Sequence, residues 1–232
     1  TTYEPSSNIP RWQMALYLTR TATVAGHTLG SGADQGFTDI SGKSAEIVLA
    51  IDQIAELGIT VGKTATTFAP DDNVTREEMA MFIERWLENV KAGPGGQSDA
   101  DGLVAAATTT YVTSDCAAAV ACTGKYNYTD IDAGSVTVEG ANAIKELYDM
   151  GIHDGVSATT FNPSSDMTRA AMATFMTAAL GHTNARPAGL TIQASLYTNA
   201  GAHTPTLSVS DRDASFGAVS GTPVDVFYWT TS

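Results

Sequence analysis

The chain has 232 residues, of which 43% are hydrophobic and 16% are charged, so it can bury a core and does not have the composition of a disordered chain. Its formal net charge of −13 at pH 7 argues against a nucleic-acid partner, which favours a basic face. No run of about 20 apolar residues occurs, so the sequence predicts no membrane span.

One pattern occurs three times along the chain. An aromatic residue, any residue and a proline are followed by an arginine, which stands eight residues after the aromatic in every copy. Met-Ala then follows three and four residues after the arginine. The aromatic residues are Tyr3, Phe68 and Phe161, and the arginines are Arg11, Arg76 and Arg169. A short repeated unit must pack against its siblings to bury its apolar face, so the clefts between copies are the first candidates for a functional site.

The second and third copies also have an opening half. It begins with Phe-Thr-Asp-Ile at residue 37 and with Tyr-Thr-Asp-Ile at residue 128, which places Asp39 and Asp130 at equivalent positions. Apolar residues at helical spacing follow in each copy and predict a helix. Gly58 and Gly151 come next, and glycine there predicts a left-handed helix cap. The unit is therefore predicted as helix, glycine-closed loop, proline turn and second helix.

The arginines are predicted to lie at the starts of the second helices. Thr75 and Thr168 stand at N-cap positions, and Thr75 forms a capping box with Glu78. A cation at the first helical position is unfavourable by roughly 0.3–1 kcal/mol, so its repetition suggests a use. An arginine fork beside free backbone N–H groups suits a carboxylate or phosphate oxygen, and we interpret Arg76 and Arg169 as anion sites.

A second interpretation of the arginines stays open. Each one could instead form a salt bridge with an acidic residue of a neighbouring copy, such as Asp39 or Asp130. The two roles can also coexist.

This layout resembles the S-layer homology (SLH) family, whose motif opens with Phe-x-Asp and closes with Thr-Arg-Ala-Glu at the start of a helix. The resemblance covers roughly residues 1 to 182. It implies a mainly α, pseudo-threefold helical domain of three tandem motifs, the first of which contains only its second half. It also implies binding of secondary cell-wall polysaccharide, often through an anionic, pyruvylated sugar, and attachment of an exported protein to the cell surface.

The resemblance implies a set of ligand-binding residues. They are the arginines Arg11, Arg76 and Arg169, the opening aspartates Asp39 and Asp130, the loop glycines Gly58 and Gly151, and Glu78 of the closing segment. The first copy has Gln13 and the third has Ala171 where the family has glutamate, which makes binding there less secure than at the second copy. Trp12 follows Arg11, and it either stacks on a sugar ring or packs between helices.

The domain boundaries follow from the repeats. We predict the second half of motif 1 in residues 1–22, a linker in 23–36, motif 2 in 37–92, an insertion in 93–127, motif 3 in 128–182, and a β-rich segment in 183–232.

The insertion contains the two cysteines and a faint metal pattern. Cys116 and Cys122 are separated by five residues, which favours a small disulfide loop in an exported protein over a metal pair or two free thiols. Asp99 and Asp101 faintly resemble a calcium loop, but the regular ligands are missing, so a solvated acidic turn is the preferred interpretation. We therefore expect no cofactor.

The last segment is predicted to contain strands. Residues 190–195, 206–210 and 224–229 have strand-like patterns. Three or four strands are too few for a complete immunoglobulin-like sandwich, so the segment is either part of a larger domain or an assembly contact.

Catalytic signatures are missing from the sequence. It contains no Gly-x-Ser-x-Gly elbow, paired-histidine metal motif or phosphate loop, and no carboxylate pair stands out. The four histidines form no spaced pair, and surface or loop positions are expected for them: His27, His153, His182 and His203.

Two functions remain in view, and neither is enzymatic. The first is an extracellular anchoring module that binds cell-wall polysaccharide in clefts between repeats. The alternative is a self-assembling subunit of a surface lattice, filament or virion appendage, in which the insertion and the β segment contact other copies of the chain.

Overall fold

The structure is a computed structural model of the chain, and it describes residues 2–90, 128–131, 134–153, 155–183, 189–194, 207–212, 219–221 and 223. The predicted disulfide between Cys116 and Cys122, the calcium alternative at Asp99 and Asp101, and the strand predicted at 224–229 lie outside the described residues.

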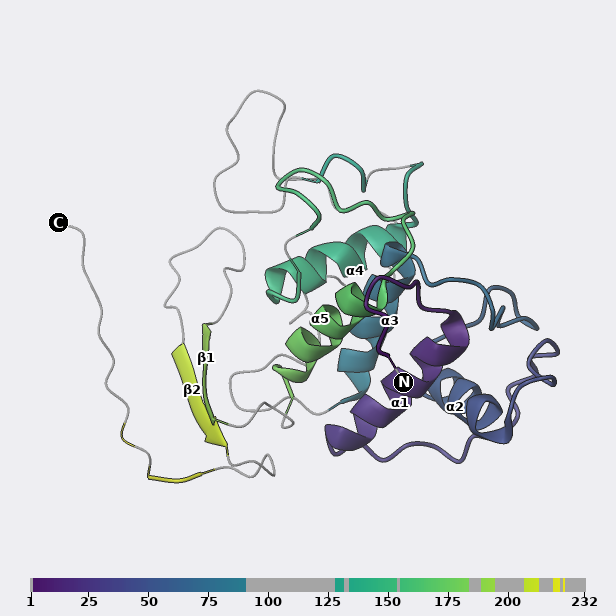
Figure 1. Ribbon diagram of the computed structural model, residues 1–232, viewed down its shortest axis with the longest axis horizontal. Helices are drawn as coiled ribbons and strands as arrows, with labels where there is room; N and C mark the ends of the chain where they lie inside the picture. The colour runs from purple at the N-terminus through teal and green to yellow at the C-terminus, as the bar shows by residue number, and fades with distance from the viewer. Residues whose placement is uncertain are drawn as a thin grey trace.

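Five helices make up the core of the described part, so the predicted mainly helical architecture is confirmed (Figure 1). They are α1 (Arg11–Val24), α2 (Ala45–Glu56), α3 (Arg76–Asn89), α4 (Val138–Asp149) and α5 (Arg169–Leu180). Helix α1 packs against α2, and α3 packs against α4. The opening helix of each later copy therefore lies on the second helix of the copy before it.

The helix ends follow the sequence signals. The side chain of Thr75 accepts a hydrogen bond from the Glu78 backbone N–H, and the Glu78 carboxylate accepts one from the Thr75 N–H, which completes the predicted capping box. Thr168 caps α5 in the same way through Ala171 N–H. Gly58 follows α2 with φ of 73°, and Gly151 follows α4 with φ of 72°. Left-handed glycine therefore ends both opening helices, as predicted.

The three proline turns form a closed ring. The backbone N–H of Ile9 donates to the Met167 oxygen at 3.0 Å, Met167 N–H donates to Val74 at 2.7 Å, and Val74 N–H donates to Ile9 at 2.9 Å. Each copy thus both gives and receives one hydrogen bond. Residues far apart in the sequence are locked together through buried backbone groups that need partners.

A second set of bonds, which runs in the opposite direction around the ring, fixes the helix starts. The backbone N–H of the first residue in each second helix donates, at 2.9 Å, to a carbonyl oxygen in the turn of the next copy. The pairs are Arg11 to Asp72, Arg76 to Ser165, and Arg169 to Ser7. These amides have no partner within their own helix, so the neighbouring turn satisfies them.

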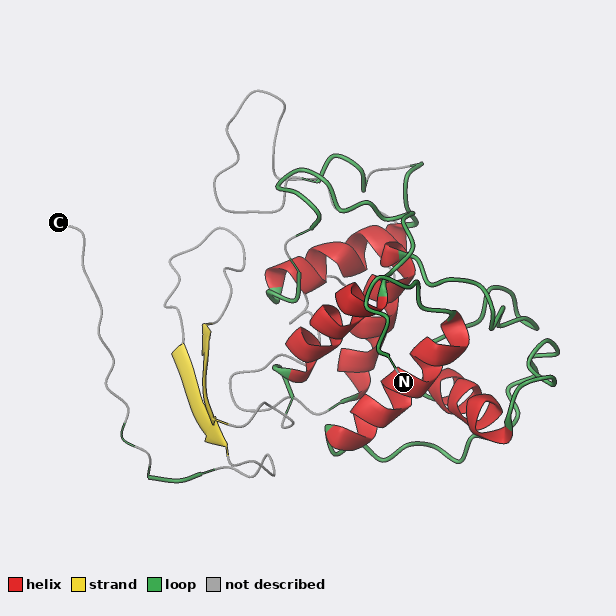
Figure 2. Cartoon of the chain, in the orientation of Figure 1, coloured by secondary structure: helices red, strands yellow, loops and turns green. Residues whose placement is uncertain are grey.

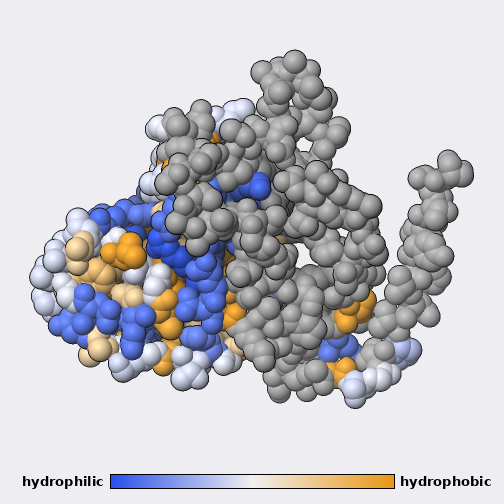
Figure 3. Space-filling view, turned by 180° about the vertical axis from the view of Figure 1, so that it is seen from behind, coloured by the Kyte–Doolittle hydropathy of each residue, from blue (hydrophilic) through white to orange (hydrophobic). Residues whose placement is uncertain are grey.

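One apolar core lies inside the ring. Phe68 and Phe161 are fully buried, and so is Trp86, whose indole Nε1–H donates to the Leu18 oxygen at 3.1 Å. The methionines at helical spacing, such as Met79, face this core, as expected for packing residues. On the face in Figure 3, the described residues present mainly hydrophilic surface with small, separate apolar patches.

The C-terminal segment contributes two antiparallel strands, β1 (Gly189–Ala194) and β2 (Leu207–Arg212). Leu190 lies opposite Asp211 in the register. Figure 2 shows the strand pair at one side of the helical cluster. The partial immunoglobulin-like fold stays a prediction.

Within the described residues, no helix is long and apolar enough to cross a membrane.

Candidate functional site

Each repeated arginine lies over an aromatic ring of the next copy. The guanidinium carbon of Arg11 is 4.7 Å from the ring centre of Phe68. The corresponding distances are 4.5 Å from Arg76 to Phe161 and 4.8 Å from Arg169 to Tyr3. Cation–π contacts of this kind strengthen when water is excluded. The sequence positions predicted as a set therefore form three equivalent contacts between copies.

The same aromatic residue also holds the arginine through its backbone. Arg11 Nε–H donates to the Phe68 oxygen at 2.8 Å. Arg76 Nε–H donates to Phe161 at 2.6 Å, and Arg169 Nε–H donates to Tyr3 at 2.7 Å. This bond fixes the guanidinium plane and leaves the two terminal nitrogens for other partners. We call the three places the Arg11, Arg76 and Arg169 clefts.

Two of the three arginines are strongly buried. Arg11 is 2% exposed and Arg76 is 9% exposed. Burial lowers the pKa of Arg11, and nearby carboxylates, first of all Glu78, offset part of this effect. Burial also lowers the pKa of Arg76. Both side chains remain cationic because the guanidinium pKa starts so high.

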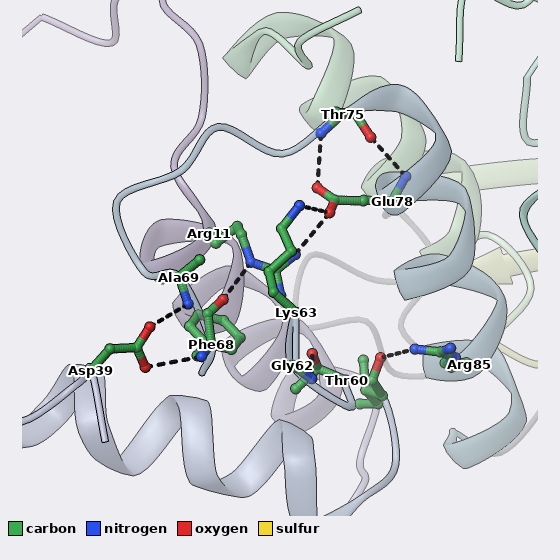
Figure 4. A network of polar contacts seen from close by, with 11 residues as sticks. Arg11, Asp39, Thr60, Gly62, Lys63, Phe68, Ala69, Thr75, Glu78 and Arg85 are labelled. Atoms are coloured by element: carbon green, nitrogen blue, oxygen red, sulfur yellow. Dashed lines mark hydrogen bonds and ion pairs between the residues drawn. The ribbon is translucent and has the colours of Figure 1, made fainter. Parts of the chain in front are cut away.

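In the Arg11 cleft, Glu78 neutralises the arginine (Figure 4). Its Oε1 lies 3.3 Å from Arg11 Nη1 and also accepts from Lys63 Nζ. Its Oε2 accepts from the Thr75 N–H at 3.1 Å. One carboxylate therefore serves as helix cap and as counter-ion for two cations.

A groove of about 200 Å³ opens beside this cluster. Its lining comes from the start of α1, the loop after α2, helix α3 and the start of α4, and includes Arg11, Thr60, Gly62, Glu78, Arg85 and Glu139. Ligand pockets for drug-sized molecules measure roughly 300–1,000 Å³. This groove suits one small polar group, and it contains both positive and negative side chains.

The opening aspartates support the turns. Asp39 accepts from the backbone N–H groups of Phe68 at 2.9 Å and Ala69 at 2.7 Å. Asp130 accepts equivalent bonds from Phe161 and Asn162. The alternative that an arginine pairs with an acidic residue of a neighbouring copy holds for Arg11, but its partner is Glu78 and not Asp39. A ligand-binding role for the aspartates stays a prediction.

The backbone N–H groups beside the arginines are not free, so that part of the anion-site argument is wrong. The N–H of the first helical residue is bonded to the next turn, and so is that of the second: Trp12 to Pro70 at 2.9 Å, Glu77 to Pro163 at 3.0 Å, and Ala170 to Pro5 at 3.0 Å. An incoming anion would therefore meet the guanidinium groups and not the helix starts.

The three clefts differ at the third helical residue. Gln13 accepts from Arg169 Nη1 at 2.6 Å, and the Tyr17 hydroxyl accepts from Arg169 Nη2 at 3.0 Å. Arg76 Nη2 is buried and has no hydrogen-bond partner among the described residues. Its cleft has Ala171 at the third helical position, where no side chain can accept.

The remaining predicted residues lie close to these contacts. Trp12 is half-buried directly after Arg11. Gly58 and Gly151 are exposed where they end α2 and α4. Their roles in ligand binding stay predictions.

Two histidines lie in loops, as the expectation of surface or loop positions allows, but their side chains are buried. His153 is 7% exposed and His182 is 6% exposed. Each donates from Nε2 to a backbone oxygen: His153 to Ile144 at 2.8 Å, and His182 to Met150 at 3.0 Å. Desolvation by burial lowers the pKa of His153 to about 4.

Sequence reasoning missed a second aromatic in each cleft. Phe82, Phe175 and Tyr17 lie 5.3, 5.7 and 6.0 Å from their arginines. Each stands six residues after the arginine of its own copy, so the repeat itself contained the signal. The cleft residues Lys63 and Arg85 had no such signal, because the third copy has Val156 and Ala178 there.

In the part of the chain that the structure describes, no group of three or more His, Cys, Asp or Glu side chains could hold a metal ion.

Comparison with known proteins identifies the repeated segments. Residues 36–80 and 128–173 match the model of the S-layer homology domain. A stretch of 172 residues is 26% identical to an endoglucanase of Bacillus sp. strain KSM-635. The match covers 73% of this chain but 14% of that protein, so the chain spans only a small part of the relative's length.

Proposed function

Since residues 36–80 and 128–173 are S-layer homology segments, a kind of domain that anchors proteins to the cell wall, we propose that this chain is a non-catalytic anchoring module at the cell surface. The observation that supports this most strongly is the repeated cleft. An arginine, stacked on an aromatic ring and bonded to its carbonyl, occurs between every pair of neighbouring copies. The N–H donors at the edge of a stacked guanidinium suit a planar carboxylate, such as that of an acidic sugar.

The ligand that fits these clefts is an anionic cell-wall polysaccharide, and a carboxylate-bearing sugar such as a pyruvylated residue is the finer proposal. The net charge of −13 repels an anion at long range. Such repulsion is screened over about 8 Å at physiological ionic strength. Attraction is therefore local, between the acidic group and the guanidinium it reaches.

The relative suggests how the module is used. The endoglucanase is much longer than the matched stretch. We propose that the shared part is the attachment module, and that no step of glycan hydrolysis takes place in the helical domain. Residues 1–22, 37–92 and 128–182 would be its three motifs, and the β-rich segment a separate part.

Binding to purified cell-wall sacculi tests the anchor. The chain is expected to co-sediment with intact sacculi and to stay in solution after the attached polysaccharide has been removed chemically. Equal binding to both preparations would contradict a polysaccharide anchor.

Two variants assign the binding to the clefts. Replacing both Arg76 and Arg169 by alanine should weaken binding to intact sacculi by about 100-fold, if each lost charge-assisted contact costs a factor of about ten. Arg20→Ala is the matched control, because Arg20 is exposed and pairs with Glu46 at the surface. Unchanged binding by the double variant, with the helical content retained, would place the site elsewhere.

A further inference from the structure

The three clefts are built alike but differ in what already occupies the arginine. In the Arg11 cleft the acceptor is the Glu78 carboxylate, and in the Arg169 cleft it is the neutral amide of Gln13. Both residues are third in their helix. The third copy has Ala171 at this position. The acceptor at this position is therefore charged in the Arg11 cleft, neutral in the Arg169 cleft and missing in the Arg76 cleft.

Without an acceptor at this position, Arg76 has a terminal nitrogen that makes no hydrogen bond among the described residues. Its Nη2 is buried without a hydrogen-bond partner, and its one hydrogen bond within the described residues is the Nε–H bond to Phe161. A buried donor without an acceptor is costly, and more so when it is charged. An acceptor that enters from outside would relieve this cost.

Among the described residues, the carboxylate whose charge acts on Arg76 is already engaged. This carboxylate is Asp130, and its oxygens accept from two backbone N–H groups. The position equivalent to Asp72, whose charge acts on Arg11, is Ser165 in the third copy. Among the described residues, the Arg76 cleft thus lacks the acidic neighbours that Glu78 and Asp72 provide in the Arg11 cleft.

We propose that the third helical residue decides which cleft accepts an acidic group, and that the Arg76 cleft, which has Ala171 there, is the strongest site for a sugar carboxylate. The Arg169 cleft follows, because Gln13 and Tyr17 are neutral acceptors. The Arg11 cleft is last, since Glu78 must give way before a carboxylate binds. This ranking rests on the proposed function because it concerns the same clefts.

The side-chain Nε–H signals of the three arginines provide a direct readout. Each Nε–H donates to a backbone oxygen, which slows its exchange with water and makes it observable by NMR. The signals are assigned with single Arg→Lys variants. The probe is methyl glucuronoside, a sugar with one carboxylate, and methyl glucoside is the neutral control.

The expected result is a saturable shift of the Arg76 signal at the lowest glucuronoside concentration, with no response to the glucoside. Ala171→Glu should raise the apparent Kd at Arg76 by at least about tenfold, because it supplies the competing carboxylate. It should not unfold the protein, since Thr168 is placed to form a capping box with it. Ala171→Gln adds the same bulk without the charge and should weaken binding less.

The reciprocal exchange is Glu78→Ala, which should make the Arg11 signal respond to glucuronoside. The inference is overturned if Ala171→Glu leaves the Arg76 response unchanged, if Ala171→Gln weakens it as much, or if the Arg11 signal responds first in the unaltered chain.

This test is separate from sacculus binding. Glucuronoside binding at Arg76 without binding to sacculi would reject the proposed anchor and keep the ranking of clefts. Sacculus binding that Ala171→Glu does not affect, together with no shift at Arg76, would keep the proposed anchor and reject the ranking of clefts.

Discussion

At the scale of single residues, the repeated arginine combines packing with charge. Its flat face covers an aromatic ring and its Nε–H binds a backbone oxygen, so the side chain is held before any ligand arrives. The partners of the two terminal nitrogens differ from cleft to cleft. A neighbour at a single position, Glu78 or Gln13, therefore changes the chemistry of an otherwise constant site.

The charge of Arg76 also affects the pKa of His153, a buried histidine. Its Nε2–H donates to Ile144, and its Nδ1 accepts from the Gly155 N–H at 3.1 Å, so both ring nitrogens are used by the neutral form. Desolvation lowers the pKa of His153 to about 4, and the charge of Arg76 adds to this effect. The ring also stacks on Phe175 at 5.5 Å. A proton on Nδ1 would break this arrangement.

His153 should make the protein less stable in mild acid. In the unfolded chain the histidine binds a proton near pH 6.5, whereas in the folded chain it binds one only near pH 4. The unfolded state thus holds more protons in this window, so the free energy of unfolding falls as pH decreases, by up to about 1.4 kcal/mol per pH unit. Urea titrations from pH 7 to pH 4 measure the slope.

The comparison with His153→Gln isolates this effect. Burial raises the pKa of Glu84 to about 8, with the Glu88 charge adding to it, so Glu84 contributes a slope of opposite sign between about pH 4.5 and 8. That contribution is common to both proteins. Parallel pH profiles for the two would contradict the account of His153.

At the scale of elements, the aromatic-x-Pro turn is the part of each copy that contacts the neighbouring copies. Its middle residue has left-handed φ in all three copies: 54° at Glu4, 56° at Ala69 and 57° at Asn162. This conformation is unfavourable for residues with a side chain. Asp39 and Asp130 compensate in the second and third copies by accepting the N–H groups of the aromatic residue and of the residue after it.

Asp39→Ala should destabilise the fold by about 1–3 kcal/mol, because two backbone N–H groups of the turn lose a charged acceptor. Urea unfolding at pH 7 measures this. Asp71→Ala is the control, since Asp71 is largely exposed and its pair with Lys43 at the surface should contribute less than about 1 kcal/mol. Equal losses for the two variants would show that Asp39 does not support the turn.

The helix boundaries could largely be predicted from the sequence, but the residues that pair with the repeated arginines could not. Thr75 and Thr168 mark helix starts, and Gly58 and Gly151 mark helix ends, because capping is local chemistry. Spacing along the chain does not tell in which direction the copies follow one another around the ring. That direction decides which residue lies beside each arginine. Arg11 therefore pairs with Glu78, whereas Arg76 Nη2 has no partner among the described residues.

At the scale of the whole molecule, closure of the ring brings distant segments together. The Tyr3 hydroxyl donates to the Arg169 oxygen at 3.0 Å. Asn8 and Asn73 both donate to the Asp166 carboxylate, at 2.8 and 2.7 Å. Contacts between such distant segments form at a cost in loop-closure entropy, so the three clefts exist only in the folded domain. An anionic chain thereby presents oriented cations at three defined places, and two of them, Arg11 and Arg76, are buried.

The most direct test of the account is a crystal structure of the chain with the acidic oligosaccharide released from the cell wall. The account predicts a sugar in a cleft between copies, with its acidic oxygen within hydrogen-bond distance of a repeated arginine, and Arg76 occupied first. An oligosaccharide bound on another surface, with all three guanidinium groups unchanged, would contradict it.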